Sequence, residues 1–133
     1  MTVTINAVSG TGVVTTSDGS GIVKLQSNSV TTNALAWVNF NGTGTVAIRS
    51  SYNVSSITDN GTGDYTINFA TALSDTNYAA VFGGGSQTVG IGAYVTEQND
   101  SVIRSTTQLR IYTTGQGSIL RDTAVVSVSI FGN

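Results

Sequence analysis

The stretch YNVSSITDNGTGDYTINFA, residues 52–70, decides the fold class of this 133-residue chain. In its second half Tyr65, Ile67 and Phe69 alternate with polar residues, which is the period of a half-buried β-strand. The first half alternates in the same way. Between the halves, Asn60-Gly61 tolerates positive φ angles and predicts a type I′ turn. The stretch is therefore predicted to be a β-hairpin, the strongest in the sequence.

Similar alternating runs occur on both sides of this hairpin, and residues that favour helices are scarce. The runs cover residues 2–8, 13–16, 22–26, 34–41, 45–49, 77–82, 88–96, 107–113 and 123–131. Gly83-Gly84-Gly85 is expected to join two of them as a loose loop. About eight to ten short strands with regular turn signals predict an all-β fold, an antiparallel β-sandwich that is jelly-roll-like or immunoglobulin-like.

The large apolar residues divide the chain into two parts. Residues 1–30 hold no aromatic side chain and are expected to form an N-terminal arm or an extra hairpin, whereas residues 31–133 are expected to form the sandwich domain. Trp37 is predicted to anchor the core, with a sugar-stacking platform as the alternative. The full set of predicted core residues is Trp37, Phe40, Tyr65, Ile67, Phe69, Val126 and Val128.

Composition excludes several function classes. The chain has no Cys and no His, which excludes disulfides, thiolate or imidazole metal sites and a Ser-His-Asp triad. Its five basic residues are too few for the clustered phosphate contacts of nucleic-acid binding. No apolar run approaches the roughly 20 residues of a membrane span, and the start of the chain does not read as a signal peptide. We therefore expect no cofactor, no metal, no nucleic-acid partner and no membrane partner.

Asp59 and Asp64 are the one acidic pair whose spacing invites a catalytic interpretation. They flank the predicted hairpin turn, and a glycosidase needs two carboxylates about 5 to 10 Å apart. Asp59 stands at the start of a turn, however, where its side chain ordinarily caps backbone amides. A calcium loop is a further alternative, although the loop lacks the alternating acids of an EF-hand. We expect the turn role, and hence no enzyme.

The low charge of the chain predicts assembly. Charged residues make up 9% of the sequence, where a soluble domain has about 25%. Sheet edges are usually guarded by Lys or Pro, but this chain has no Pro and a single Lys, Lys24. We expect a homo-oligomer, most simply a homotrimer, that buries its edges against other chains. The residues expected to contact partners are Val3, Ile5, Ile22, Lys24 and Leu25 in the arm and the outward-facing Tyr94 and Tyr112 in the sandwich.

Four blocks resemble a family of tailed-bacteriophage virion proteins, usually called tail-fibre, tip or structural proteins. They are AWVNFNGTGTVAIR (36–49), SYNVSSITDNGTGDYTINF (51–69), DTNYAAVFG (75–83) and VVSVSIFGN (125–133). The resemblance implies a β-sandwich displayed on the particle surface, generally as a homo-oligomer, and it brings no catalytic motif. Fibre proteins of that kind place the module after a long shaft, whereas the first block here starts at Ala36. This difference favours a self-contained particle protein.

The resemblance and the composition together predict a non-enzymatic virion structural protein. Its expected place is the capsid exterior, as a cement or decoration protein that clamps the major capsid protein after synthesis in the host cytoplasm. The alternative is a tail-fibre, spike or head-fibre knob that binds a host surface glycan or receptor. A secreted lectin or hydrolase of similar fold is the third hypothesis.

Overall fold

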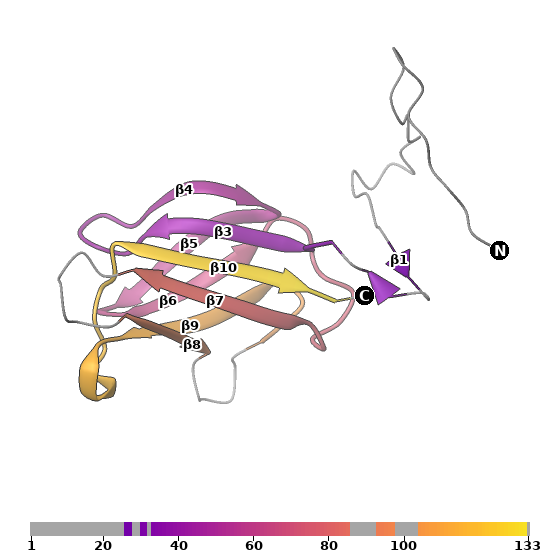
Figure 1. Cartoon of the computed structure of the whole chain (residues 1–133). Coiled ribbons are helices and arrows are strands. Elements are labelled where there is room, and N and C mark those ends of the chain that lie inside the picture. Colours follow the sequence, from indigo (N-terminus) through magenta and orange to yellow (C-terminus); the bar gives the residue numbers. More distant parts are fainter. Residues whose placement is uncertain (1–25, 28–29, 32, 86–92, 98–103, 133) are drawn as a thin grey trace, which may run out of the picture.

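The computed structural model describes residues 26–27, 30–31, 33–85, 93–97 and 104–132. These residues form ten strands and one 3₁₀ turn, and Figure 1 shows how the strands are arranged. The strands are β1 (Gln26–Ser27), β2 (Val30–Thr31), β3 (Ala36–Asn41), β4 (Ala47–Tyr52), β5 (Val54–Gly61), β6 (Asp64–Phe69), β7 (Ala79–Gly85), β8 (Tyr94–Glu97), β9 (Gln108–Thr114) and β10 (Val125–Phe131), and the turn, η1, covers Gln116–Ser118.

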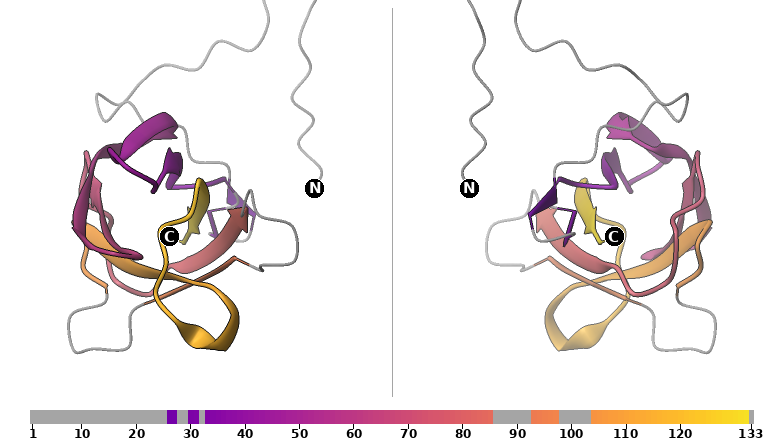
Figure 2. Two further views of the ribbon diagram at one scale, coloured as in Figure 1. Left: turned by 90° about the vertical axis from the view of Figure 1, so that its left-hand side faces the viewer. Right: turned by 90° about the vertical axis from the view of Figure 1, so that its right-hand side faces the viewer.

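Eight of the strands build the predicted sandwich. One antiparallel sheet has the order β4-β3-β10-β7, and the other has the order β5-β6-β9-β8. Figure 2, which looks along the strands, shows the two sheets curving around a common interior. β1 and β2 pair with each other in a separate small sheet. The expected strands at 2–8 and 13–16, and most of those at 22–26 and 88–96, lie outside the described residues.

The hairpin predicted within residues 52–70 is β5–β6, but its turn differs from the expected one. Thr62-Gly63 forms the turn, with Gly63 at φ 67°, and the register shifts between Asp59 and Gly61. The expected type I′ turn at Asn60-Gly61 was therefore wrong. The shift leaves Asn60 as an extra residue whose amide donates to Thr66 Oγ1 at 2.9 Å. Tertiary contact decides the turn, because a Cβ at position 63 would lie only 2.5 Å from the Thr113 carbonyl oxygen.

The core lies between the inward faces of the two sheets. Six of the seven predicted core residues are buried: Phe40, Tyr65, Ile67, Phe69, Val126 and Val128. The prediction for Trp37 was wrong, because this side chain remains 37% exposed. Ala36, Val38 and Phe40 are the side chains of β3 that face the core, and strand alternation then turns Trp37 to the outside.

Gly83-Gly84-Gly85 is not the expected loop but the end of strand β7. The three glycines pair with Ser127, Val126 and Val125 of β10. A Cβ at Gly84 would lie 2.9 Å from Cγ2 of Val95 and 3.3 Å from the Ala93 carbonyl oxygen. The missing side chain thus lets the edge strands β7 and β8 approach each other and close that side of the sandwich.

A buried tyrosine ties the turns at one end of the sandwich together. The Tyr65 hydroxyl lies 2.7 Å from the Gly42 carbonyl oxygen and 2.9 Å from Asp122 Oδ1, and it shares its proton between these acceptors. The Gly63 amide donates to the same Asp122 oxygen at 2.8 Å. Burial, followed by the neighbouring Asp122, raises the pKa of Tyr65 well above its ordinary value. The hydroxyl therefore remains a donor at any ordinary pH.

Candidate binding surfaces

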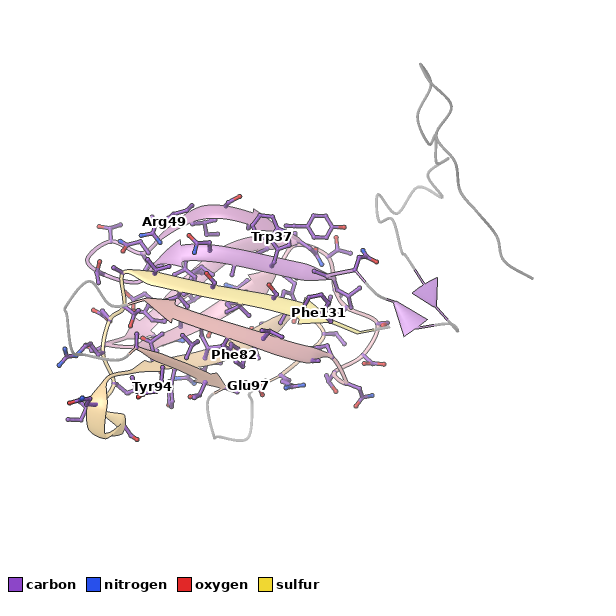
Figure 3. The ribbon with its side chains drawn as sticks, viewed as in Figure 1. Trp37, Arg49, Phe82, Tyr94, Glu97 and Phe131 are labelled. Carbon is purple, nitrogen blue, oxygen red and sulfur yellow. The ribbon has the colours of Figure 1, made fainter. Side chains whose placement is uncertain are left out.

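The two tyrosines predicted to contact partners lie on one outer face of the sandwich. β8 and β9 are antiparallel neighbours, with Tyr94 opposite Thr114 and Thr96 opposite Tyr112. Val95 of β8 packs against the core, so its neighbours in the strand point outward. Tyr94 is the most exposed of these side chains, with 59% of its surface accessible. Figure 3 shows it near the start of β8.

The segment after β9 turns this face into a groove. The Gly115 amide donates to the Ile119 carbonyl oxygen at 2.9 Å, and Leu120 forms a bridge with Thr114. Two adjoining hollows of about 400 and 490 Å³ lie between this segment and the strands. We call them together the tyrosine groove. Its lining consists of Tyr94, Thr96, Glu97, Tyr112, Thr114, Gly115, Gln116, Gly117, Ser118 and Leu120.

The lining carries one ionisable carboxylate, Glu97, and that group is already paired. Arg104 donates through Nε to Glu97 Oε2 at 2.9 Å and through Nη2 to Oε1. The same guanidinium lies 5.0 Å from the centre of the Tyr78 ring and donates to the Tyr78 carbonyl oxygen. Its hydrogen bonds to Glu97 raise the pKa of Arg104, and burial raises the pKa of Tyr78 to about 12. The pair is thus a charged clamp that leaves the groove close to neutral.

The other sheet presents an exposed aromatic surface. Strand register aligns Tyr52, Trp37, Ser129 and Val81 in one row across β4, β3, β10 and β7. We call this row the Trp37 face. Tyr52 and Trp37 are each 37% exposed, and Val81 is 58% exposed. Figure 3 shows Trp37 on the outside of its sheet, with Phe131 nearby on β10.

Neutral polar groups continue the Trp37 face along the strands. Asn39 is two residues from Trp37, and its amide donates to Ser127 Oγ at 2.8 Å. Arg49 is the nearest cation in this part of the sheet, and its Nη2 donates to the Ala124 carbonyl oxygen at 2.6 Å. The resulting surface is aromatic at one end and rich in amides and hydroxyls at the other. Its cation, Arg49, is hydrogen-bonded to a backbone carbonyl oxygen.

The acidic pair at the hairpin has structural partners. Asp59 Oδ1 accepts the Gly61 amide at 3.0 Å, which is the expected turn cap. Asp64 accepts from Arg110 at both oxygens, at 2.9 and 2.6 Å. The hydrogen bond from Arg110 is the largest cause of the lowered pKa of Asp64. Among the residues that the structure describes, no group of three or more acidic, His or Cys side chains comes together.

The structure thus brings some of the predicted contact residues together and leaves others untested. Tyr94 and Tyr112 line the same groove. The arm residues Val3, Ile5, Ile22, Lys24 and Leu25 lie outside the described residues.

Sequence reasoning missed two features of these surfaces. Gln116 and Ser118 lie between two of the expected strands, and nothing in their local sequence points to a groove wall. The exposure of Trp37 did carry a signal, because Asn39 and Asn41 share its face of the strand whereas Val38 and Phe40 share the other.

Comparisons of the chain with protein-family models, curated proteins and solved structures found no match. Within the described part of the chain, no helix is long and apolar enough to cross a membrane. The tyrosine groove and the Trp37 face are the two surfaces from which a function can be argued.

Proposed function

We propose that this chain is a non-enzymatic structural protein of a bacteriophage virion, and that it acts as a cement or decoration protein on the capsid exterior. The observation that carries the proposal is the Trp37 face. Tyr52 and Trp37 are exposed on neighbouring strands of one sheet face, and Val81 is exposed in the same row beyond Ser129. Large apolar side chains exposed together on one face are typical of protein–protein contact.

Exposed aromatic side chains on an outer sheet face suit docking onto a particle. Trp and Tyr are enriched among the residues that dominate binding energy at interfaces, where they fill partly preformed pockets. The low charge of the chain also helps, because few ions need to be desolvated when the surface is covered. The partner is the major capsid protein, and the N-terminal arm adds a strand to an exposed edge of the lattice.

The same surface chemistry supports a homo-oligomer, most simply a homotrimer. The outer strands β4 and β5, on the side of the sandwich away from β7 and β8, carry neither Pro nor Lys. Edges of this kind ordinarily need cover. Light scattering on the purified chain tests this part of the proposal, and a stable monomer at micromolar concentration contradicts it.

Particle binding tests the role of the Trp37 face. We expect Trp37→Ala to weaken binding to stripped particles of the parent phage at least about tenfold, as loss of an interface Trp ordinarily does. Tyr94→Ala, on the other sheet, is the matched control and should bind normally. If the Trp37→Ala variant occupied the stripped particles fully, this face would be excluded as the docking surface.

A second candidate function is a fibre or spike knob that binds a host glycan. The tyrosine groove favours it, because the groove is hollowed and lined by aromatic, hydroxyl and amide groups. Copy number separates the two functions. A cement protein occurs in hundreds per particle and a knob in a few dozen at most, and an image reconstruction of the particle counts either.

A further inference from the structure

We propose that the tyrosine groove is a binding site for a neutral saccharide about two sugar rings long. The site is on the sheet opposite the Trp37 face, so it stands independently of the proposed docking to a capsid. If the chain is a knob, neutral saccharides of this length are the class of glycan that the knob recognises.

The shape of the groove fits an elongated small ligand. Its two hollows, of about 400 and 490 Å³, share Thr96, Thr114 and Ser118 in their linings. Each volume falls within the roughly 300–1,000 Å³ that is usual for small-molecule sites. Two adjoining hollows with a common wall indicate a ligand that runs along the groove, as a disaccharide does.

Tyr94 supplies the apolar platform that a sugar ring needs. Its side chain is 59% exposed at one end of the groove, and Tyr112 lines the adjoining hollow. Aromatic rings present a broad apolar surface at a low cost in conformational entropy, since a tyrosine side chain has only two χ angles. The C–H face of a pyranose packs on such a ring, and its hydroxyls remain at the rim.

The remaining lining offers hydrogen-bonding groups without free charge. Thr96, Thr114 and Ser118 each carry a hydroxyl that donates and accepts. These groups match the hydroxyls of a sugar. Glu97 is held by Arg104 in a two-point pair, so among the described lining residues neither an anionic nor a cationic ligand finds an unpaired opposite charge.

The wall of the groove holds an unusual backbone conformation. Ser118 has φ 60°, one of two non-glycine residues with positive φ in the described chain, and Gly117 before it has φ 74°. Non-glycine residues adopt this region only rarely. The hydrogen bond from the Gly115 amide to the Ile119 carbonyl oxygen closes the loop that contains Gly117 and Ser118. The path of the wall is thus defined by backbone conformation and a backbone hydrogen bond.

Titration with defined sugars tests the proposal. The probes are the neutral disaccharides maltose, cellobiose, lactose and N,N′-diacetylchitobiose, with 3′-sialyllactose and glucosamine as charged controls. Amide NMR spectra are followed up to about 10 mM sugar, which detects millimolar dissociation constants. We expect at least one neutral disaccharide to shift the amides of Thr96, Tyr112 and Ser118 saturably, and the charged sugars to bind at least about tenfold more weakly.

Two variants assign the binding to the groove. Tyr94→Ala should weaken it at least about tenfold, and Tyr94→Phe, which keeps the ring, should restore most of it. Tyr52→Ala on the opposite sheet is the control and should bind as the parent does. Thermal melts confirm that each variant is folded.

The proposal is overturned if none of the neutral sugars shifts the groove amides, if a charged sugar binds more tightly, or if Tyr94→Ala binds normally. Particle binding by Tyr94→Ala is measured in parallel. If this variant no longer bound particles, the docking surface would lie at the groove. If it bound them normally, the proposed capsid role would stand whatever the sugar titration shows.

Discussion

Trp37 lies on the outside of the sandwich because its neighbours in the strand are better placed to fill the core. Val38 and Phe40 face inward, where Phe40 packs edge-on against Tyr65 with ring centres 5.3 Å apart. Asn39 shares the outward face with Trp37 and hydrogen-bonds to Ser127 there. Turning Trp37 inward would bury Asn39 in the core instead. The cost of burying that amide decides which face the largest side chain of the chain occupies.

Alanine substitutions at Phe69 and Trp37 should therefore differ sharply. Phe69 is buried, and its removal is expected to lower the free energy of unfolding by about 3 to 5 kcal/mol. Trp37→Ala removes a partly exposed side chain and should cost about 1 kcal/mol or less. Urea denaturation of the two variants measures both values. Equal losses would show that the inward and outward faces of the sheets are assigned wrongly.

Asp64 should make the free energy of unfolding depend on pH in the acidic range. Arg110 lowers the pKa of this carboxyl in the folded chain, so its stabilising contribution is present above the unfolded value of about 3.9. That contribution is lost as the pH falls through the lower folded pKa. Asp64→Asn is expected to cost about 1 kcal/mol near pH 6 and to approach the parent's stability near pH 2.

Denaturation curves at several pH values measure this difference. Arg110→Gln serves as the control, because loss of the guanidinium should remove the same pH-dependent part. A stability difference for Asp64→Asn that stays constant from pH 6 to pH 2 would contradict the assignment.

At the level of elements, β7 and β8 close one side of the sandwich, and Gly84 makes their approach possible. An added Cβ there would meet Val95 Cγ2 at 2.9 Å, whereas at Gly83 the nearest atom is Ser127 Cβ at 3.6 Å. The two glycines are adjacent in one strand, so they share sequence context and differ in tertiary surroundings.

Alanine at these two positions provides a matched pair. Gly84→Ala should lower the free energy of unfolding by about 1 to 3 kcal/mol, since the crowded edge strands must move apart. Gly83→Ala should leave it within about 0.5 kcal/mol of the parent, because its contact is an ordinary one. Thermal and urea melts compare them. Equal effects would indicate that backbone flexibility, and not the approach of β8, explains the glycine at 84.

The chain passes between the two sheets at Asn53, which joins β4 to β5. This residue has φ 53°, and its side-chain amide donates to the Leu35 and Thr71 carbonyl oxygens at 3.1 and 3.2 Å. Its Oδ1 accepts the Thr71 amide at 2.8 Å. Only this one residue connects the two strands. Its three hydrogen bonds to backbone groups hold the chain in the sharp turn between the sheets. Asn is well suited to this place, because it tolerates positive φ and offers both a donor and an acceptor.

For the whole molecule, the sandwich is complete without the N-terminal part. All eight of its strands lie between Ala36 and Phe131, and the first and the last of them, β3 and β10, are central neighbours. Deleting residues 1–30 is therefore expected to leave a cooperatively folded domain, with a melting temperature within a few degrees of the parent's. Circular dichroism and a thermal melt measure this.

The same deletion separates folding from docking. Under the proposed function, the shortened chain should lose occupancy on particles although it is folded. Loss of the cooperative melt would mean that the first 30 residues belong to the sandwich after all. Full occupancy on particles would place the docking surface entirely within residues 31–133.

Local sequence determined the strands of this protein and most of their inward faces, because a strand places alternate residues on opposite sides whatever it pairs with. The alternation of Tyr65, Ile67 and Phe69 and that of Val126 and Val128 were enough to identify buried side chains. The low charge and the absence of His and Cys, which exclude whole classes of site, are also properties of the sequence alone.

Only the tertiary structure decided which strands share a sheet and what meets on the outer faces. β10 pairs with β3 and β7, which are far from it in sequence, and that pairing makes Gly83-Gly84-Gly85 a strand and aligns Trp37 with Val81. The tyrosine groove likewise needs β8, β9 and the segment after β9 to lie together. Pairing between distant segments depends on how the faces of all the strands pack at once, and no local pattern of side chains contains that information.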